Sequence, residues 1–335
     1  MSESGRKRPV SSVDVAVHAG VSQATVSRVL SGTTPVSERT REKVERALDE
    51  LGYQPNANAR ALKTQRTKTI AVVVADITNP FYPELVEALN EALSAAGQMM
   101  LLWDAAVAGD DGSVIAAIQQ RLVDGAIFAT AMRGSETLRR AQELDLPVAL
   151  INRGLPSLEI DAVTSDNEGG GRTVARYFLE AGRNPAVIAG PEAASTSRER
   201  AAGFLAEWQA ARPDYEPFVS YNEFSDESGR QFCDEVLSSD DPPDAIFATN
   251  DYTAFGVLDE AKRRGVRVPE DLWVVGYDDI AMSDWSLFDL TTVRQPTSKM
   301  AREAVRLLLA RIESDDLPVE SILFEGELIV RGSTG

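Results

Sequence analysis

The sequence predicts two parts of different fold class, an N-terminal all-α helix-turn-helix module and a bilobal α/β domain built from two doubly wound parallel sheets. Three observations support this prediction. The length of 335 residues fits a small module plus a body of about 270 residues. Helical patterns with good caps fill the first 54 residues. From Thr69 onward, apolar runs of strand length alternate with amphipathic stretches.

The first predicted helix begins at a capping box, because Ser11 is followed three residues later by Asp14. It ends near Gly20, which allows a tight turn. Its apolar face is expected to consist of Val13, Ala16 and Val17.

A second helix over residues 23–30 follows the N-cap Ser22 and turns Val26, Val29 and Leu30 inward. The residues left facing solvent are Gln23, Ala24, Thr25, Ser27 and Arg28. Two helices joined by a short turn with a glycine are typical of a helix-turn-helix motif, whose second helix enters the major groove. A third helix from Ser37 closes the core with Val44, Ala47, Leu48 and Leu51.

The polar residues of the second helix have the chemistry for reading DNA. Arg28 can pair with guanine and Gln23 with adenine, while Thr25 or Ser27 can hold phosphate. The alternative interpretation is an ordinary helix that shows its polar face to water.

Charge is distributed unevenly along the chain. The net charge is −18, yet residues 1–68 carry 12 lysines and arginines against 7 aspartates and glutamates, a net charge of +5, which leaves −23 on the remainder. A basic head on an acidic body favours a protein in which only the head approaches phosphate. A solvated basic tail would give the same charge difference.

The body shows the strand–helix alternation of parallel sheets. Helices are expected near 82–96, 112–123 and 135–144. Strands are expected at 70–74, 99–103, 125–129, 148–151 and 162–164 in the first lobe and at 186–189, 218–221, 245–248 and 273–275 in the second. The run Gly169–Gly171 lacks the spacing of a dinucleotide fingerprint and is expected to begin a helix after Asp166 and Asn167. No nucleotide cofactor is indicated.

Polar and aromatic residues follow several of these strands, where parallel α/β sheets bind ligands. Amides, carboxylates and guanidinium groups beside aromatic rings are the partners that a sugar needs. For each aspartate or asparagine the alternative is a cap on the next helix. The residues at these positions are Asp76, Asn79, Phe81, Tyr82, Asn152, Arg153, Asn250, Asp251, Tyr277 and Asp278.

Residues 13–32, VDVAVHAGVSQATVSRVLSG, and 35–62, PVSERTREKVERALDELGYQPNANARAL, resemble the headpiece of the lactose-repressor/purine-repressor (LacI/GalR) family, and the resemblance covers nearly the whole chain. It implies DNA contacts from Asn56 and a hinge helix whose Leu62 inserts into the minor groove. So short a helix should order only with partner and DNA. The expected domains are 11–54 for DNA binding, 55–68 for hinge and linker, and 69–335 for effector binding and dimerisation, with lobes near 69–165 and 166–294 and later crossovers.

The family's sensing domain is similar to periplasmic sugar-binding proteins, which implies a periplasmic-binding-protein-like body. By this likeness Arg200 and Asp278 recognise hydroxyls, and Phe81, Tyr82 and Phe224 sandwich a sugar ring. Asn152 departs from the Asp-Arg pair common in pentose pockets and weakens a pentose assignment. The implied effector contacts are Asn79, Phe81, Tyr82, Arg153, Arg200, Phe224, Asn250, Asp278 and Gln295.

The resemblance implies a homodimer on near-palindromic double-stranded operator DNA. A first-lobe helix at 83–95 is implied at the interface, although Leu85, Leu89 and Leu93 are equally explained as core. The ending LIVRGSTG has no apolar heptad tail, which favours a dimer over a tetramer. The expected function is a repressor released by a small sugar-type effector. The alternatives are a regulator that senses a purine or nucleoside corepressor or a phosphoprotein, and a soluble protein that only stores or delivers a sugar.

Other function classes find little support in the composition. The single histidine, His18, lies in the head, so a histidine-based triad or metal site in the body is excluded, and no enzyme, cofactor or metal is expected. Cys233 is the only cysteine, which excludes an internal disulfide. The sequence has no apolar run of about 18 residues and no signal-peptide pattern at its start, so a cytoplasmic protein without membrane contact is expected.

Overall fold

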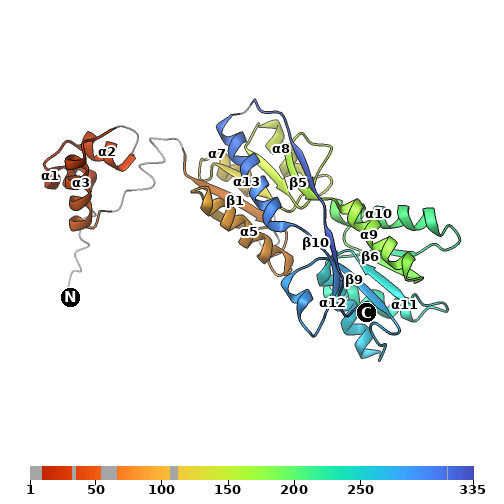
Figure 1. Ribbon diagram of the computed structural model, residues 1–335. Helices are drawn as coiled ribbons and strands as arrows, with labels where there is room; N and C mark the ends of the chain where they lie inside the picture. The colour runs from red at the N-terminus through yellow and green to blue at the C-terminus, as the bar shows by residue number, and fades with distance from the viewer. Residues whose placement is uncertain (1–9, 32–34, 54–65, 106–111, 315) are drawn as a thin grey trace, which may run out of the picture. The chain divides into compact units, whose positions relative to one another are not determined.

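The computed structural model describes residues 10–31, 35–53, 66–105, 112–314 and 316–335. The chain divides into two compact units, Met1–Thr67 and Lys68–Gly335 (Figure 1). None of the helices in the described ranges is both long and apolar enough to cross a membrane.

The first unit contains three helices, α1 (Ser12–Ala19), α2 (Gln23–Ser31) and α3 (Glu38–Leu51). The capping box is confirmed, since the Asp14 backbone donates to the Ser11 hydroxyl and the Ser11 backbone donates to the Asp14 carboxylate. Gly20 ends α1 in the left-handed conformation at φ 65°, as the turn requires.

The predicted apolar face of α1 is wrong in two of its three residues. Val13 and Val17 are 51% and 78% exposed, whereas Val15 and Ala16 are buried against Val26, Val44 and Ala47. In a helix of eight residues both faces have helical spacing, so periodicity alone does not select one. The contacts of α1 with α2 and α3 decide that Val15 faces inward.

The hinge predicted over 55–68 falls almost entirely outside the described residues, and so do Asn56 and Leu62. The roles assigned to these two residues therefore stay predictions.

The second unit contains two six-stranded sheets of identical internal order. The first runs β11-β5-β4-β3-β1-β2 and the second β12-β10-β9-β8-β6-β7. All neighbouring strands are parallel except β10 and β12. The first sheet consists of β1 (Thr69–Val74), β2 (Met99–Asp104), β3 (Gly125–Phe128), β4 (Val148–Ile151), β5 (Asp161–Ser165) and β11 (Ser321–Phe324). The second consists of β6 (Pro185–Ala189), β7 (Phe218–Tyr221), β8 (Ala245–Ala248), β9 (Trp273–Asp278), β10 (Thr291–Arg294) and β12 (Glu327–Ile329).

Helices cover both faces of each sheet, as a doubly wound fold requires. On the first sheet, α5 (Phe81–Ala95) and α13 (Thr297–Glu313) cover one face, and α7 (Gly112–Gln119) and α8 (Glu136–Glu143) cover the other. On the second, α9 (Asn167–Glu180) and α10 (Ser195–Ala211) lie opposite α11 (Asp226–Leu237) and α12 (Asp251–Arg263). A short 3-10 helix, η1 (Ala281–Asp284), follows β9.

The chain crosses between the lobes three times, after β5, after β10 and after β11. The returning helix α13 lies beside α5 (Figure 1). Arg311 on α13 donates to both carboxylate oxygens of Asp161 on β5 at 2.9–3.1 Å, which fixes α13 to the first lobe.

Candidate functional site

A cavity with about 270 Å³ of empty space lies between the lobes, outside the carboxyl ends of their strands. This is where the sequence predicted a ligand. Every predicted effector contact except Gln295 lines it. The lining residues are Asn79, Phe81, Tyr82, Asn152, Arg153, Thr196, Arg200, Phe224, Asn250 and Asp278.

Arg200 is the best-connected side chain of the cavity. Its Nε donates to Asn167 Oδ1 at 2.9 Å, and its Nη1 donates to the Thr249 carbonyl at 2.6 Å and to Asp278 Oδ1 at 3.1 Å. The guanidinium carbon lies 3.6 Å from the centroid of the Tyr277 ring. Only 2% of Arg200 is exposed, so these contacts fix the direction in which it faces the cavity.

Two glycines allow α9 and α10 to pack closely enough to place Arg200. A Cβ on Gly171 would lie 2.1 Å from the Arg200 carbonyl oxygen, and one on Gly203 would lie 2.1 Å from the Glu168 carbonyl oxygen. Both helices therefore need a residue without a side chain at the contact. The glycine run does lie at the start of a helix, as predicted, but the helix already begins at Asn167, and its N-cap Asp166 accepts from the Gly169 backbone.

Asp278 faces Arg200 at the end of β9. Burial raises the pKa of its carboxyl to about 7, although Arg200 and a hydrogen bond from Gln295 act to lower it. Both partners use the same oxygen, Oδ1, with Gln295 Nε2 donating at 2.7 Å. The second oxygen is thus left to accept from a ligand hydroxyl. The backbone of Asp278 has φ 124°, a strained conformation of the kind often held at binding sites.

Gln295 does not line the cavity in this structure. It lies behind Asp278 with 4% of its surface exposed and orients that carboxylate. Its position supports the site through Asp278.

A second buried carboxylate, Asp251, lies behind the cavity at the first turn of α12. It accepts from the Ile280 backbone at 3.0 Å, from Ser283 Oγ at 2.7 Å and from Thr292 Oγ1 at 2.5 Å. Burial raises the pKa of Asp251 to about 6. Asp251 thereby links the strand-end loop that carries Asn250 to η1 and β10.

The first lobe supplies two of the aromatic rings of the cavity, Phe81 and Tyr82, and the second lobe supplies Phe224. The Phe81 and Tyr82 rings are 5.5 Å apart at 71°, so they form a corner. Arg153 Nη2 donates to the Tyr82 hydroxyl at 3.1 Å, and the Arg153 guanidinium carbon lies 5.4 Å from the Phe224 ring centroid. Asn79 Oδ1 accepts from the Phe81 backbone at 3.1 Å, which holds the loop that presents both rings.

Asn250 both caps helix α12 and lines the cavity. Its Oδ1 accepts from the Thr253 backbone at 3.2 Å as the N-cap of α12, while the same side chain lines the cavity. The two interpretations drawn from the sequence for this residue are therefore compatible.

Thr196 lines the cavity although it was not predicted as a ligand contact. Thr196 lies four residues before Arg200 on α10 and hence on the same helix face. That spacing was the available signal. Within the described ranges no cluster of three or more histidine, cysteine, aspartate or glutamate side chains could hold a metal ion.

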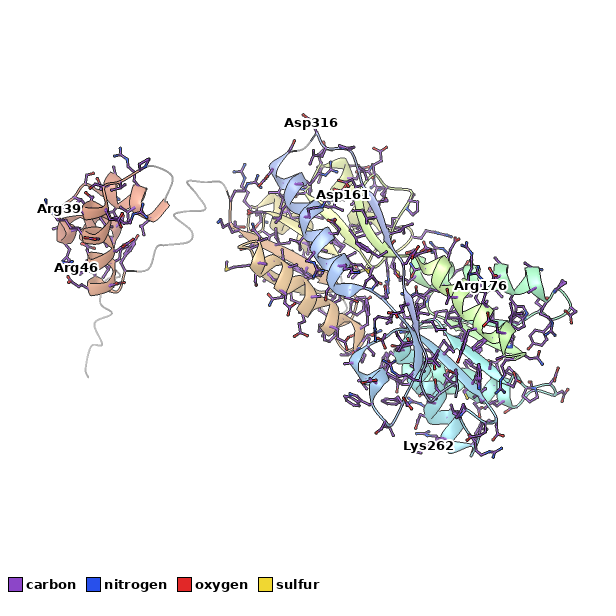
Figure 2. The ribbon with its side chains drawn as sticks, viewed as in Figure 1. Arg39, Arg46, Asp161, Arg176, Lys262 and Asp316 are labelled. Carbon is purple, nitrogen blue, oxygen red and sulfur yellow. The ribbon has the colours of Figure 1, made fainter. Side chains whose placement is uncertain are left out.

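In the first unit, α2 presents its predicted polar residues unevenly. Gln23, Ala24 and Arg28 are exposed, whereas Thr25 and Ser27 are half-buried. Gln23 Nε2 donates to Ser12 Oγ at 3.0 Å, which ties the first residue of α2 to α1. The exposed arginines Arg39 and Arg46 lie on α3 (Figure 2).

Comparisons with known proteins agree with this architecture. Residues 13–56 match the model of bacterial regulatory proteins of the lacI family, and residues 175–334 match a periplasmic binding protein-like domain. The HTH-type transcriptional regulator DegA of Bacillus subtilis is 35% identical over 327 residues, covering 96% of this chain and 97% of DegA.

Two solved structures extend the likeness to the whole fold. The lac repressor dimer bound to operator and the anti-inducer ONPF superposes with a TM-score of 0.86 at 26% identity, covering 98% of this chain and 99% of that one. The transcriptional regulator CelR–cellobiose complex gives 0.72 at 35% identity, covering 97% and 100%.

The three-helix unit and the two-lobed domain with a polar cavity together define an HTH-type transcriptional regulator. The chain belongs to the LacI family of bacterial regulatory proteins.

Proposed function

We propose that this regulator is a homodimeric repressor that acts in the cytoplasm and is released from near-palindromic operator DNA by a small sugar bound between its lobes. One observation carries the effector part. The Arg200–Asp278 pair and the Asn250 amide converge on a cavity that is also lined by the rings of Phe81, Tyr82 and Phe224, and such an arrangement suits hydroxyls and C–H faces. The relative CelR was solved with cellobiose, which supports a sugar.

The lining of the cavity narrows the ligand class. Polar and charged side chains from both lobes surround it together with three aromatic rings, which suits a small polyhydroxy molecule. We propose binding without chemistry, since the single histidine, His18, lies in the first unit beside Glu50 at 2.6 Å.

Exposed apolar residues of the body support a dimer. Met99, Leu101 and Leu102 lie on β2 and are 40–60% exposed, and β2 is an edge strand of its sheet. An exposed apolar edge normally finds a partner or a cover. The lac repressor structure is a dimer on operator. The faces of Leu85, Leu89 and Leu93 are fully buried in the core, so those residues of α5 do not form the interface.

Contacts between the lobes offer the route by which a ligand acts. The Ala281 backbone of η1 donates to Glu84 Oε1 on α5 at 2.8 Å, and the Gly154 backbone donates to Ser195 Oγ at 3.2 Å. A ligand that changes the lobe closure must change these bonds. Coupling between sites in allosteric proteins commonly amounts to about 1–3 kcal/mol.

The test uses the full chain and an operator selected from random duplexes. Arg28→Ala should lower the preference for that operator over random DNA by about 10- to 100-fold, because a base contact is lost. Arg46→Ala removes the same charge from α3 and should leave the preference unchanged. Equal effects of the two variants, measured by fluorescence anisotropy, would contradict base reading by α2.

A further inference from the structure

The two arginines of the cavity are equally buried but differ in their partners. Arg153 is 4% exposed and Arg200 2%. Arg200 has a carboxylate partner in Asp278. For Arg153, the polar contacts in the described part of the chain are the Tyr82 hydroxyl at 3.1 Å and the Met132 sulfur at 3.2 Å, and no carboxylate lies within 4.0 Å of its guanidinium. Its Nε has no acceptor among the described residues.

The nearby carboxylates do not compensate Arg153. Asp278 uses Oδ1 to accept from both Arg200 and Gln295. Asp76 is exposed, and its Oδ1 accepts from the backbone and hydroxyl of Thr78. The cavity therefore holds two buried guanidinium groups and one carboxylate. A buried charge without a partner is costly, so an excess positive charge here needs a function.

The side chain of Asn152, next to Arg153 in the sequence, also has an unpaired atom among the described residues. Asn152 is 5% exposed and lines the cavity, and its side-chain oxygen finds no donor among the described residues. An aspartate at this position would have placed a carboxylate next to Arg153 on the same side of the cavity. The neutral amide leaves the positive charge of Arg153 available to a ligand and adds both a donor and an acceptor beside it.

We propose that the effector is an anionic sugar, a polyhydroxy compound whose carboxylate or phosphate binds Arg153 while its hydroxyls bind Asp278, Asn250 and Asn152. This proposal rests on the proposed sugar-type effector and specifies its charge. The anionic group supplies the counter-charge that the first-lobe side of the cavity lacks. A fork of guanidinium donors matches carboxylate and phosphate alike.

The first test compares sugars of equal size on the full-length protein by isothermal titration calorimetry. The probes are D-glucose, D-glucuronate and D-glucose 6-phosphate, with D-galactose and D-galacturonate as a second pair. At least one anion should bind about 10- to 100-fold more tightly than its neutral parent, the range for a hydrogen bond to a charged group. A comparison of D-glucuronate with D-glucose 6-phosphate then shows whether the side of the cavity around Arg153 binds a carboxylate or a phosphate.

Three variants test which residues cause the tighter binding of the anionic sugar. Arg153→Gln should bring the affinity for the anion down to that of the neutral sugar, and Asn152→Asp should do the same by pairing with Arg153. Arg172→Gln removes an exposed arginine from α9 and should change nothing. Tighter binding of a neutral sugar, or a preference for the anion that survives Arg153→Gln, overturns this proposal and leaves a sugar effector standing. Failure of every probe to bind overturns both.

A measurement without ligand tests the unpaired charge itself. Arg153→Met should raise the unfolding temperature of the ligand-free protein, because it removes a buried cation that has no carboxylate partner. Arg200→Met should lower it. A fall for Arg153→Met as large as that for Arg200→Met would show that Arg153 is a structural residue and would overturn the proposal.

Discussion

Replacing Arg200 with methionine removes the guanidinium that joins three segments of the second lobe while keeping most of the side-chain volume. The variant loses the bonds to Asn167, to the Thr249 carbonyl and to Asp278. It also leaves the Asp278 carboxyl buried with Gln295 as its remaining partner among the described residues. Breaking one side of a buried pair typically costs about 3–5 kcal/mol.

That cost should be visible as a shift of the unfolding temperature. Domains of about 150–250 residues lose about 2–4 °C for each kcal/mol, so Arg200→Met should lower the melting of the body by about 10 °C in differential scanning calorimetry. Response to effector should be lost as well, since the hydroxyl-binding pair is gone.

A double variant measures how much of the lost free energy of unfolding comes from the interaction between Arg200 and Asp278. Adding Asp278→Leu to Arg200→Met removes the stranded carboxyl and should recover about 1–3 kcal/mol of the lost free energy of unfolding, as expected for groups in direct contact. Strictly additive losses, or an Arg200→Met protein that melts within about 1 °C of wild type, would refute the assignment of Arg200 as the organising residue of the lobe.

Three further predictions concern groups outside this pair. Burial raises the folded pKa of Asp251 from 3.8 to about 6, so the stability it contributes is complete below about pH 4 and is lost as the pH rises through about 6, by about 3 kcal/mol. The pKa of Asp278 is raised to about 7, which adds a second fall of the same sign. Urea unfolding from about pH 4 to 7.5 should show both falls, and Asp251→Asn should remove its own part and leave that of Asp278. The buried Cys233 thiol has its pKa raised to about 12, so a thiol reagent at neutral pH should react with it only in denaturant. Ser11→Ala should destabilise the first unit by about 1 kcal/mol, measured by hydrogen exchange, whereas Ser37→Ala should cost less because the Ser37 side chain makes no capping bond to the backbone.

The sequence predicted most strands because parallel strands buried on both faces are continuous apolar runs, as in β3, β4 and β8. It missed β10 because two of its four residues, Thr291 and Thr292, look like a polar loop. Both are fully buried, and their hydroxyls are satisfied by the Arg331 carbonyl and by Asp251. It also missed β11 and β12, which are short, partly exposed edge strands.

The position of the cavity followed from the rule about strand ends, and the resemblance added Arg200, Phe224 and Gln295, of which Gln295 lies behind the cavity. What neither supplied is the arrangement of partners. Thr196 enters the cavity because α10 packs on α9 through Gly171 and Gly203, and Gln295 lies behind Asp278 because β10 is the next strand of the sheet. Such placements depend on helix packing and strand order, which local patterns do not encode.

Arg153 and Arg200 illustrate where that missing information matters. The sequence does not distinguish the two residues. Arg153 follows β4, Arg200 lies on the helix after β6, and the family resemblance implies that both contact the ligand. Their burial is alike too. Only the partners differ: the protein itself satisfies Arg200 through three acceptors, whereas Arg153 keeps an unpaired nitrogen and a charge without a carboxylate. Because folded proteins pair nearly all buried polar groups, a buried guanidinium with an unpaired nitrogen in a ligand cavity is the observation that the proposed anionic effector accounts for.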